Sequence, residues 1–491
     1  MRALRRFAIL CHRWMGVAFC LLFSWWFVSG IFMMYSDYPS VGPREYLAHA
    51  RAIDSARVML TARHAAERLG GDPGPVELVM FDGRPAYRFR EAGGFVYADD
   101  GSVQDQYPKD MLLRIASQWT GQPAAAARVQ EVVQPDQWTL GVRGLLPLWK
   151  YTFADGQQVY VSESAGEVVQ ATTRGSRILA ELGPIPHWLY YTPLRVRSKL
   201  WTRVVVWLSG AATVAALLGL IVGITVWWPS KRVPYTGQKR LHTILGLFFG
   251  VIACTWAFSG MLSMEPFPVS RPGPRADTAA GRVIAALRPA PPKLADFDML
   301  PPREDLAQVK SLAFTSFDGE PLYLAALASG ETKIIPVGNS QVDAARIGQI
   351  VTRAAAPTAI AERTLLTQYD AYYVDRHGER PLPVLRVALD DPDHTRLYID
   401  PLTGQVVGLH SDHSSFVTRW LYHGLHSMDF PWLYNHRPAW DVVVLALMLG
   451  GLSVSVTSVI LAWQVLRRTG SQAAWRRRRN ARPSSANPAR P

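Results

Sequence analysis

The sequence predicts a membrane protein: a four-helix transmembrane bundle of two parallel repeats, which carries two α+β periplasmic domains. Three observations predict this fold. Hydrophobic residues make up 49% of the 491 residues, and charged residues only 19%. Four apolar stretches are each long enough to cross a hydrocarbon core of about 30 Å. The two halves of the chain also match each other in sequence, which indicates a duplication.

The four apolar stretches contain no acidic or basic side chain, and they lie at residues 14–35, 204–228, 243–264 and 442–465. They divide the chain into eight segments. These are a cytoplasmic N-terminus with the first span (1–35), a first periplasmic domain (36–203), the second span (204–228), a cytoplasmic loop (229–242), the third span (243–264), a second periplasmic domain (265–441), the fourth span (442–466) and a basic, disordered cytoplasmic tail (467–491).

Basic residues determine the predicted topology. Lys and Arg gather before the first span, between the second and third spans, and after the fourth span. These segments share one side of the membrane, which the positive-inside rule makes cytoplasmic. The net charge of +13 is therefore read as a topology signal, and no nucleic-acid partner is predicted. Four basic residues oppose this topology, at the end of a long domain where charge has less influence: Arg195, Arg197, Lys199 and Arg203.

The two halves match at nearly constant offsets. A shift of 230 residues places His12 on His242, Gly16 on Gly246 and Ser29-Gly30 on Ser259-Gly260. In the outer domains a shift of 236 or 238 residues aligns the turn signals, and the 236 shift places His187 on His423. Parallel repeats imply a pseudo-twofold axis along the membrane normal. Matched residues of the first and third spans should then lie at the same depth.

The two outer domains have an α+β pattern. Residues 56–69 and 341–355 are periodic enough for amphipathic helices. Strand-like runs alternate with turn signals, which are F-D-G at 81–83 and 317–319, A-D-G at 154–156, S-A-G at 164–166 and the strand–turn–strand run L-Y-I-D-P-L-T-G-Q-V-V at 397–407. The Pro-rich stretch 266–302 is predicted to be a linker.

Two histidines lie near the cytoplasmic ends of parallel spans. His12 and His242 are repeat mates, and Gly16 and Gly246 each follow one helical turn later on the same face. Paired histidines across a twofold axis suit a metal held by two imidazoles. Zinc usually takes four protein ligands, whereas haem needs two axial ligands and room for a flat ring. The glycines would provide that room, or else they serve tight helix–helix packing.

A second histidine group lies at the other membrane face. His187 precedes the second span, and His423 and His426 precede the fourth. The 236 register pairs His187 with His423, but counting back from the valine triplets at 204–206 and 442–444 favours His426. The assignment of the outer ligand therefore stays open between these two. A b-type haem at each face is the predicted cofactor content, because the chain has no C-x-x-C-H motif for a c-type haem.

Motifs for other cofactors are missing from the sequence. There is no G-x-G-x-x-G after a strand and no P-loop, so no flavin or nicotinamide domain is predicted in this chain. Electrons would come from a membrane quinol or from a redox partner.

Several of these features together resemble the PepSY-associated transmembrane family. The features are the His-x3-Gly spans ending in W-x-x-S-G, the segments H-W-L-Y and W-L-Y-H-G-L-H, and the hairpin Y-I-D-P-L-T-G-Q-V-V. The resemblance covers about residues 5–468. It implies PepSY-like outer domains, a bacterial inner-membrane location with both termini cytoplasmic, and haem iron held by His12, His242, His187 and His423 or His426.

The family includes iron-regulated inner-membrane proteins and ferric-siderophore reductases. The resemblance therefore implies a dihaem oxidoreductase that reduces a periplasmic ferric siderophore and releases ferrous iron, with periplasmic iron-handling proteins as further partners. One alternative is a haem-free scaffold whose PepSY-like domains bind a periplasmic protein or peptide. A permease is a third possibility, which the lack of polar residues in the spans disfavours.

Overall fold

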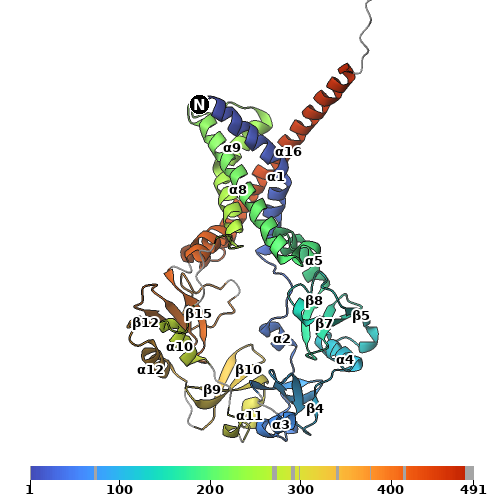
Figure 1. Cartoon of the computed structure of the whole chain (residues 1–491), viewed down its shortest axis with the longest axis vertical. Helices are drawn as coiled ribbons and strands as arrows, with labels where there is room; N and C mark the ends of the chain where they lie inside the picture. Colours follow the sequence, from blue (N-terminus) through green and yellow to red (C-terminus); the bar gives the residue numbers. More distant parts are fainter. Residues whose placement is uncertain are drawn as a thin grey trace, which may run out of the picture. The chain divides into compact units, whose positions relative to one another are not determined.

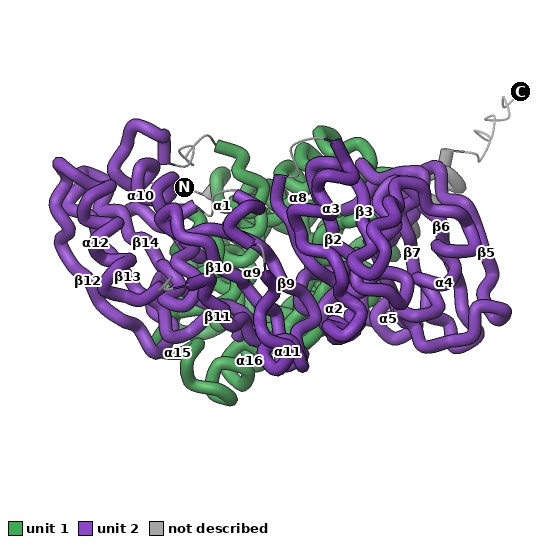
Figure 2. The backbone as a smooth tube through the Cα atoms, turned by 90° about the horizontal axis from the view of Figure 1, so that it is seen from below, with its two compact units in different colours: residues 1–37, 181–267, 418–491 green, residues 38–180, 268–417 purple. Residues whose placement is uncertain are grey.

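The computed structural model describes residues 2–70, 74–267, 274–288, 293–297, 299–338, 342–375, 378–412 and 416–480. The chain forms two compact units (Figure 2). The helical unit comprises Met1–Asp37, Glu181–Phe267 and Thr418–Pro491. The β-sheet unit comprises Tyr38–Ala180 and Pro268–Val417.

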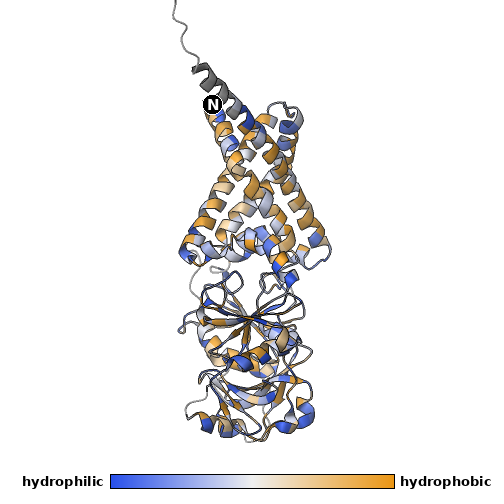
Figure 3. Cartoon of the chain, turned by 90° about the vertical axis from the view of Figure 1, so that its right-hand side faces the viewer, coloured by the Kyte–Doolittle hydropathy of each residue, from blue (hydrophilic) through white to orange (hydrophobic). Residues whose placement is uncertain are grey.

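Four long helices build the helical unit: α1 (Arg2–Met33), α8 (Ser198–Trp227), α9 (Gly237–Leu262) and α16 (Ala439–Asn480). Each is long and apolar enough to cross a membrane, which confirms the four predicted spans as helices of that kind. Figure 3 shows that hydrophobic residues dominate them. The chain is thus a membrane protein by length and composition of its helices.

The helices extend beyond the predicted spans, because Lys and Arg are good helix formers even where the sequence is no longer apolar. Helix α9 begins at Gly237, so His242 lies inside a helix, and residues 237–242 of the predicted loop are helical. Helix α16 continues to Asn480. The tail predicted as disordered from residue 467 is therefore helical as far as Asn480, and residues 481–491 lie outside the described residues.

The four helices contact one another in the order α1–α8–α9–α16, and α16 closes the ring on α1. This order places α1 and α9 on a diagonal. Close contacts are made where glycines meet aromatic rings. A Cβ atom on Gly450 would overlap Phe249, and one on Gly451 would overlap Phe27. These glycines let the backbone of α16 approach its neighbours.

Short helices continue the bundle on the side where α1 ends: α6 (Pro184–His187), α7 (Thr192–Arg195), the π-helix η5 (Val417–Gly424), α14 (Leu425–Ser427) and α15 (Pro431–Tyr434). Helix α6 packs on α1, and α14 packs on α9. A buried ion pair fixes the segment before α14. Arg419 donates to an Asp429 carboxylate oxygen at 2.7 Å and to the Asp429 carbonyl at 2.8 Å.

The β-sheet unit contains three antiparallel sheets, in the strand orders β11-β10-β9-β1-β2-β3-β4, β5-β6-β7-β8 and β12-β13-β14-β15. The first half of the chain supplies β1 (Val76–Phe81), β2 (Arg84–Phe89), β3 (Gly94–Tyr97), β4 (Val103–Gln104), β5 (Arg128–Val132), β6 (Leu148–Thr152), β7 (Gln158–Ser162) and β8 (Val168–Thr172). The second half supplies β9 (Val309–Phe317), β10 (Glu320–Leu327), β11 (Thr332–Pro336), β12 (Ile360–Leu366), β13 (Val384–Leu389), β14 (Arg396–Ile399) and β15 (Val406–His410).

Helices flank these sheets (Figure 1). They are α2 (Pro43–His49), α3 (Ala62–Leu69), α4 (Lys109–Thr120), α5 (Arg174–Leu182), α10 (Ala279–Leu287), α11 (Arg303–Leu306) and α12 (Ala344–Ala355), with 3-10 turns at Ser55–Arg57, Ala124–Ala126, Arg143–Leu145 and Leu294–Asp296. The helix predicted at 56–69 is confirmed only over α3, because residues 58–61 are not helical, and the helix predicted at 341–355 corresponds to α12, with residue 341 outside the described residues. Helix α12 starts where Asp343 accepts a hydrogen bond from the Arg346 backbone N–H at 2.7 Å.

The predicted hairpins are present. Asp82 and Gly83 join β1 to β2 with φ angles of 43° and 81°, and Asp318 and Gly319 join β9 to β10 with φ angles of 50° and 80°. Two consecutive residues with positive φ make the tight turn that suits a two-residue hairpin.

The linker prediction for 266–302 is partly wrong. Its residues 279–287 form α10, which packs on α12 and buries Ala280, Val283 and Leu287 in the same hydrophobic core. Residues 268–273, 289–292 and 298 lie outside the described residues.

The two predicted outer domains are not separate. Strand β1 of the first half pairs with β9 of the second half in one seven-stranded sheet. Glu77 pairs with Ala313, its own repeat mate at the 236 offset. The local twofold axis of the duplication therefore passes through this residue pair. The sequence indicated two domains because we took the limits of each domain from the neighbouring spans. The pairing of β1 with β9 joins strands that are far apart in the chain, so no short stretch of sequence indicates it.

A buried ion cluster lies beside this axis. Arg88 is 7% exposed and forms ion pairs with Glu77 and Glu167, while Ser311 of β9 donates a hydrogen bond to Glu77. Burial raises the pKa of Glu77, but the charge of Arg88 and the hydrogen bonds from Ser311 and Arg88 outweigh it, so the pKa is lowered. Glu77 is therefore ionised in the folded protein.

Replacing Arg88 tests this cluster. Arg88→Met leaves two partly buried carboxylates without their cation, a change that typically costs about 3–5 kcal/mol. We expect a lower midpoint of thermal unfolding, followed by tryptophan fluorescence in detergent. Arg90→Met is the matched control. Arg90 also pairs with Glu77, at 3.3 Å, but Arg90 is exposed, and exposed ion pairs contribute about 0–1 kcal/mol. Equal midpoints for both variants would contradict the role of Arg88.

Acid titration gives an independent prediction. A carboxylate with a lowered pKa stabilises the folded state above its unfolded pKa, and this stabilisation is lost as the pH falls through the folded pKa. The unfolding midpoint of the wild type should therefore fall on acidification below about pH 4.5. In Arg88→Met this acid-induced fall should be smaller, because without the Arg88 cation the pKa of Glu77 is no longer lowered in the folded protein to the same extent. A fall of the same size in both proteins would contradict the cluster's electrostatic role.

Candidate functional site

The bundle brings His12 and His242 together, as the repeat predicted. The two rings lie on the diagonal helices α1 and α9, with ring centres 6.2 Å apart and planes inclined by 27°. Two imidazoles bound to opposite sides of one metal ion have ring centres about 6 Å apart, because each metal–nitrogen bond is about 2.0 Å and each ring has a radius of about 1.1 Å. The observed spacing is therefore that of a two-imidazole metal site. We call His12 and His242 the inner pair.

Each ring of the inner pair is held through Nδ1 by a third helix. His12 Nδ1 lies 3.0 Å from the carbonyl oxygen of Ala215 on α8. His242 Nδ1 lies 3.1 Å from Thr457 Oγ1 on α16, and this hydroxyl donates its own proton to the Val454 carbonyl at 2.7 Å. Both oxygens can therefore only accept from the ring. Nδ1 carries the proton in both histidines, and Nε2 presents the lone pair that a metal requires.

A second pair forms where α1 ends. His187 of α6 and His426 of α14 have ring centres 6.0 Å apart, with planes inclined by 70°. His187 Nδ1 lies 3.0 Å from Ser29 Oγ, and His426 Nδ1 lies 3.0 Å from Ser259 Oγ. The two serines are repeat mates at the 230 offset. We call His187 and His426 the outer pair.

The serine hydroxyls fix the same tautomer as in the inner pair. Ser29 donates to the Trp26 carbonyl and Ser259 to the Trp256 carbonyl, each at 3.2 Å. Each hydroxyl therefore accepts from the histidine, and Nε2 again carries the lone pair. Burial lowers the pKa of His187 to about 4, so that its imidazole is neutral at physiological pH. A neutral imidazole is the form that binds a metal.

The structure brings His426, and not His423, next to His187, while the role of any of these residues as a metal ligand stays a prediction. His423 is exposed and lies beside Tyr422, with ring centres 4.6 Å apart and planes inclined by 44°. The pairing of His187 with His423 is therefore wrong. The offset between the two halves has already changed from 236 to 238 at Gly166 and Gly404, before the π-helix Val417–Gly424, and it reaches 239 at His426.

The predicted glycines do not serve tight packing. A Cβ atom on Gly16 or Gly246 would meet no atom within 4 Å, so open space lies beside each of them one turn after the inner histidines. The packing glycine at the inner pair is Gly219 of α8, where a Cβ atom would lie 2.6 Å from His12 Cε1. The sequence around Gly219 does not indicate this role, because its partner is distant in the chain.

Two tryptophans beside the outer pair have a role that we did not predict from the sequence. Trp201 Nε1 donates to the Trp188 carbonyl at 2.8 Å, and Trp440 Nε1 donates to the Ser427 carbonyl at 3.0 Å. Each acceptor is the residue directly after a histidine of the outer pair. The two indoles thus fix the backbone beside His187 and His426. Their common offset of 239 residues was a usable signal, since it is the offset that relates His187 to His426.

The two pairs fit a haem better than a zinc ion. Among the described residues, no three His, Cys, Asp or Glu side chains gather where they could hold a metal ion. Each pair would provide two nitrogen ligands, the number that haem iron takes from a protein in a b-type site of this kind. The spacing, the tautomers and the space beside Gly16 and Gly246 agree with this group.

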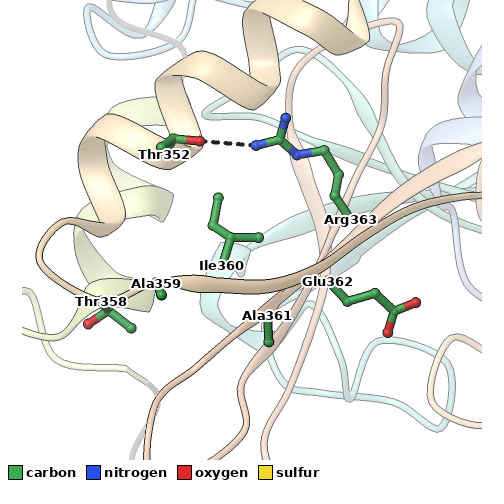
Figure 4. A pocket seen from close by; sticks show the side chains of 7 residues that line it. All are labelled: Thr352, Thr358, Ala359, Ile360, Ala361, Glu362 and Arg363. Atoms are coloured by element: carbon green, nitrogen blue, oxygen red, sulfur yellow. Dashed lines mark hydrogen bonds between the residues drawn. The ribbon is translucent and has the colours of Figure 1, made fainter.

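One surface pocket lies elsewhere, in the β-sheet unit. It is open and is lined by Thr352, Thr358, Ala359, Ile360, Ala361, Glu362 and Arg363 (Figure 4). Arg363 closes one side by donating to Thr352 Oγ1 at 3.0 Å, and Glu362 points away from the pocket. None of the predicted site residues lines it, so it is not part of the histidine sites.

Filling the space beside His12 should disturb the inner pair. In Gly219→Ala the new methyl group displaces His12, and such overpacking typically costs about 1–3 kcal/mol. Gly210→Ala on the same helix is the matched control, because its Cβ would meet only the Met261 sulfur at 3.4 Å. We expect a lower unfolding midpoint for Gly219→Ala alone, measured in detergent. A midpoint for Gly219→Ala that equals or exceeds that of Gly210→Ala would contradict the contact.

Comparison with known proteins agrees with this architecture. The family model for the PepSY-associated TM region matches residues 9–304 and again residues 239–486. The two matches begin 230 residues apart, the offset that relates His12 to His242. A search of curated proteins returned no match to the chain. Because the family model covers almost the whole chain in two copies, the protein belongs to the PepSY-associated transmembrane family.

Proposed function

We propose that this protein is a b-type dihaem oxidoreductase of the bacterial inner membrane, which passes electrons across the membrane and reduces a periplasmic ferric siderophore. One observation carries the proposal: two histidine pairs, each with metal-binding spacing and fixed tautomers, lie in one bundle. On α1, His12 and Ser29 are 17 residues apart, which corresponds to about 25 Å along a helix. This separation is close to the thickness of a hydrocarbon core, about 30 Å.

His12 and His242 would hold one haem, and His187 and His426 the other. A haem held by these residues would supply a one-electron redox centre. The protein's own residues set the conditions for it. Ala215, Thr457, Ser29 and Ser259 hold each Nδ1 proton, which keeps Nε2 directed at the site and raises its basicity. The apolar helices around the pairs would limit the access of water.

The proposed topology follows the basic residues. The basic segments at 2–13, 231–240 and 467–479 would lie in the cytoplasm, with both termini. The inner pair then lies toward the cytoplasm, and the outer pair and the β-sheet unit toward the periplasm. A membrane quinol or a redox partner would supply the electrons, and periplasmic iron-handling proteins would take up the product.

The chemistry of iron makes reduction a release step. Ferric iron is bound very tightly by the hard oxygen ligands of a siderophore, whereas ferrous iron is bound far more weakly. One electron converts ferric chelate into ferrous iron and free chelator, and no bond to the protein forms. The outer pair is the proposed point of delivery.

Spectroscopy of histidine variants tests this function. The purified protein should show b-type Soret and α bands that change on reduction with dithionite. His12→Ala or His242→Ala should remove about half of the haem, and His187→Ala or His426→Ala the other half. His423→Ala is the matched control and should remove none. If protein that is produced with haem in excess shows no such bands, the result would contradict the proposal and favour the haem-free scaffold.

The serine contacts can be tested separately. Ser259→Ala removes the acceptor for His426 Nδ1, and loss of such a contact typically weakens metal binding about 10–100-fold. We expect faster loss of the outer haem and a higher midpoint potential, because a less basic imidazole stabilises ferric iron less. Ser263→Ala on the same chain segment is the control, since Ser263 Oγ bonds only the Gly260 carbonyl, at 2.7 Å. Identical potentials in both variants would show that Ser259 does not tune the site.

A further inference from the structure

Four basic residues follow the outer pair in the first half of the chain. They form the outer basic cluster, which consists of Arg195, Arg197, Lys199 and Arg203. Arg195 ends α7, Arg197 is the N-cap of α8, and the other two lie in the first two turns of α8. Arg197, Lys199 and Arg203 are exposed. All four belong to the helical unit, as His187 does.

Within the described part of the chain, no acidic residue forms an ion pair with the cluster. The first turn of α8 contains no acidic residue. The corresponding helix of the second half differs, because α16 has Asp441 in its first turn, and Arg437 is bound to it at 2.6 Å. The start of α16 therefore has an ion pair, whereas the start of α8 has basic residues and no acidic residue in its first turn.

Arg195 is fixed in place although it has no acidic partner among the described residues. Its guanidinium carbon lies 4.9 Å from the ring centre of Tyr190 and 4.6 Å from that of Trp201. Its Nε atom is buried and has no hydrogen-bond partner in the described part of the chain. Trp201 in turn donates to the carbonyl of Trp188, the residue after His187. The stacked guanidinium thus lies one contact away from the backbone of the outer pair.

This arrangement is electrostatically unfavourable without a counter-charge. Cations at the N-terminus of a helix oppose the helix dipole, and like charges close together on a helix repel each other. On the proposed periplasmic side they also oppose the positive-inside rule. An anion bound to the cluster would offset the first two penalties, and a planar guanidinium held against aromatic rings suits a carboxylate or another flat anionic oxygen group.

We infer that the outer basic cluster is the docking surface for an anionic ferric chelate, one whose iron is held by carboxylate or catecholate oxygens with a net negative charge. The inference rests on the proposed function for the identity of the substrate, and it narrows that substrate class. A neutral or cationic hydroxamate chelate gains nothing from the four cations. Docking here places the anionic chelate beside His187, where the electron is delivered.

Binding of redox-inert gallium chelates tests this surface apart from electron transfer. The full-length protein in phosphatidylcholine nanodiscs is titrated with gallium citrate, a gallium tris-catecholate and a neutral gallium trihydroxamate. We expect saturable, salt-sensitive binding of at least one of the two anionic chelates and at least tenfold weaker binding of the hydroxamate. Charge-driven binding should weaken as salt is raised. The inference is overturned if the hydroxamate binds tightly, or if neither of the two anionic chelates binds.

Charge variants locate the binding. The triple variant Arg197→Gln, Lys199→Gln, Arg203→Gln should bind the anionic chelate about tenfold or more weakly. It spares Arg195, which packs on two rings. The matched control is the triple variant Arg232→Gln, Lys239→Gln, Arg240→Gln. It removes the same charge near the C-terminus of α8 and the N-terminus of α9, and it should bind the chelate as the wild type does. Equal binding by both triple variants overturns the inference.

Two further measurements complete the test. The first distinguishes a chelate site from a lipid site, and the second separates a failure of this inference from a failure of the proposed function. If nanodiscs of phosphatidylglycerol abolish chelate binding and the triple variant loses bound phosphatidylglycerol, the cluster is a lipid site and the inference fails. The haem spectrum is recorded on the same samples. Anionic chelate binding without haem would contradict the proposed function alone, whereas intact haem without chelate binding would contradict this inference alone.

Discussion

The helical unit depends on four hydrogen bonds from histidine Nδ1 atoms to neighbouring helices. The acceptors lie on a different helix from the histidine in every case: α8 for His12, α16 for His242, α1 for His187 and α9 for His426. Each bond fixes a ring plane, a tautomer and the position of one helix against another. A site whose spacing must hold within a fraction of an ångström needs such fixation, because an unanchored imidazole rotates about its side-chain bonds.

The sequence predicted the features whose signals are local or repeated. The four spans, the F-D-G hairpins and the inner pair follow from apolar length, turn chemistry and one constant offset. The outer pair was harder, because small insertions change the offset from 236 to 239 before His426 and the neighbouring sequence matches gave different registers. Gly219 and the indoles of Trp201 and Trp440 act through contacts between distant segments, so only the fold reveals them.

The duplication has different consequences in the two units. In the helical unit, repeat mates face each other as two separate pairs of side chains. In the β-sheet unit the repeats merge, since β1 and β9 pair about the Glu77–Ala313 position and the sheet continues across both halves. An edge strand needs a partner, and a duplicated chain provides an identical edge that satisfies it. Joining the strands also binds two distant parts of the chain into one core.

A twofold axis along the membrane normal relates the two halves of the chain but not the two ends of the bundle, so the inner pair and the outer pair are free to differ. The inner rings are inclined by 27° and the outer rings by 70°, so the two sites differ in geometry. The two halves also differ from each other, because Asp441 forms an ion pair with Arg437 near the start of α16, whereas the basic residues at the start of α8 have no described acidic partner. Cations kept on one half beside one histidine pair would suit the anionic substrate that we infer for this end of the bundle.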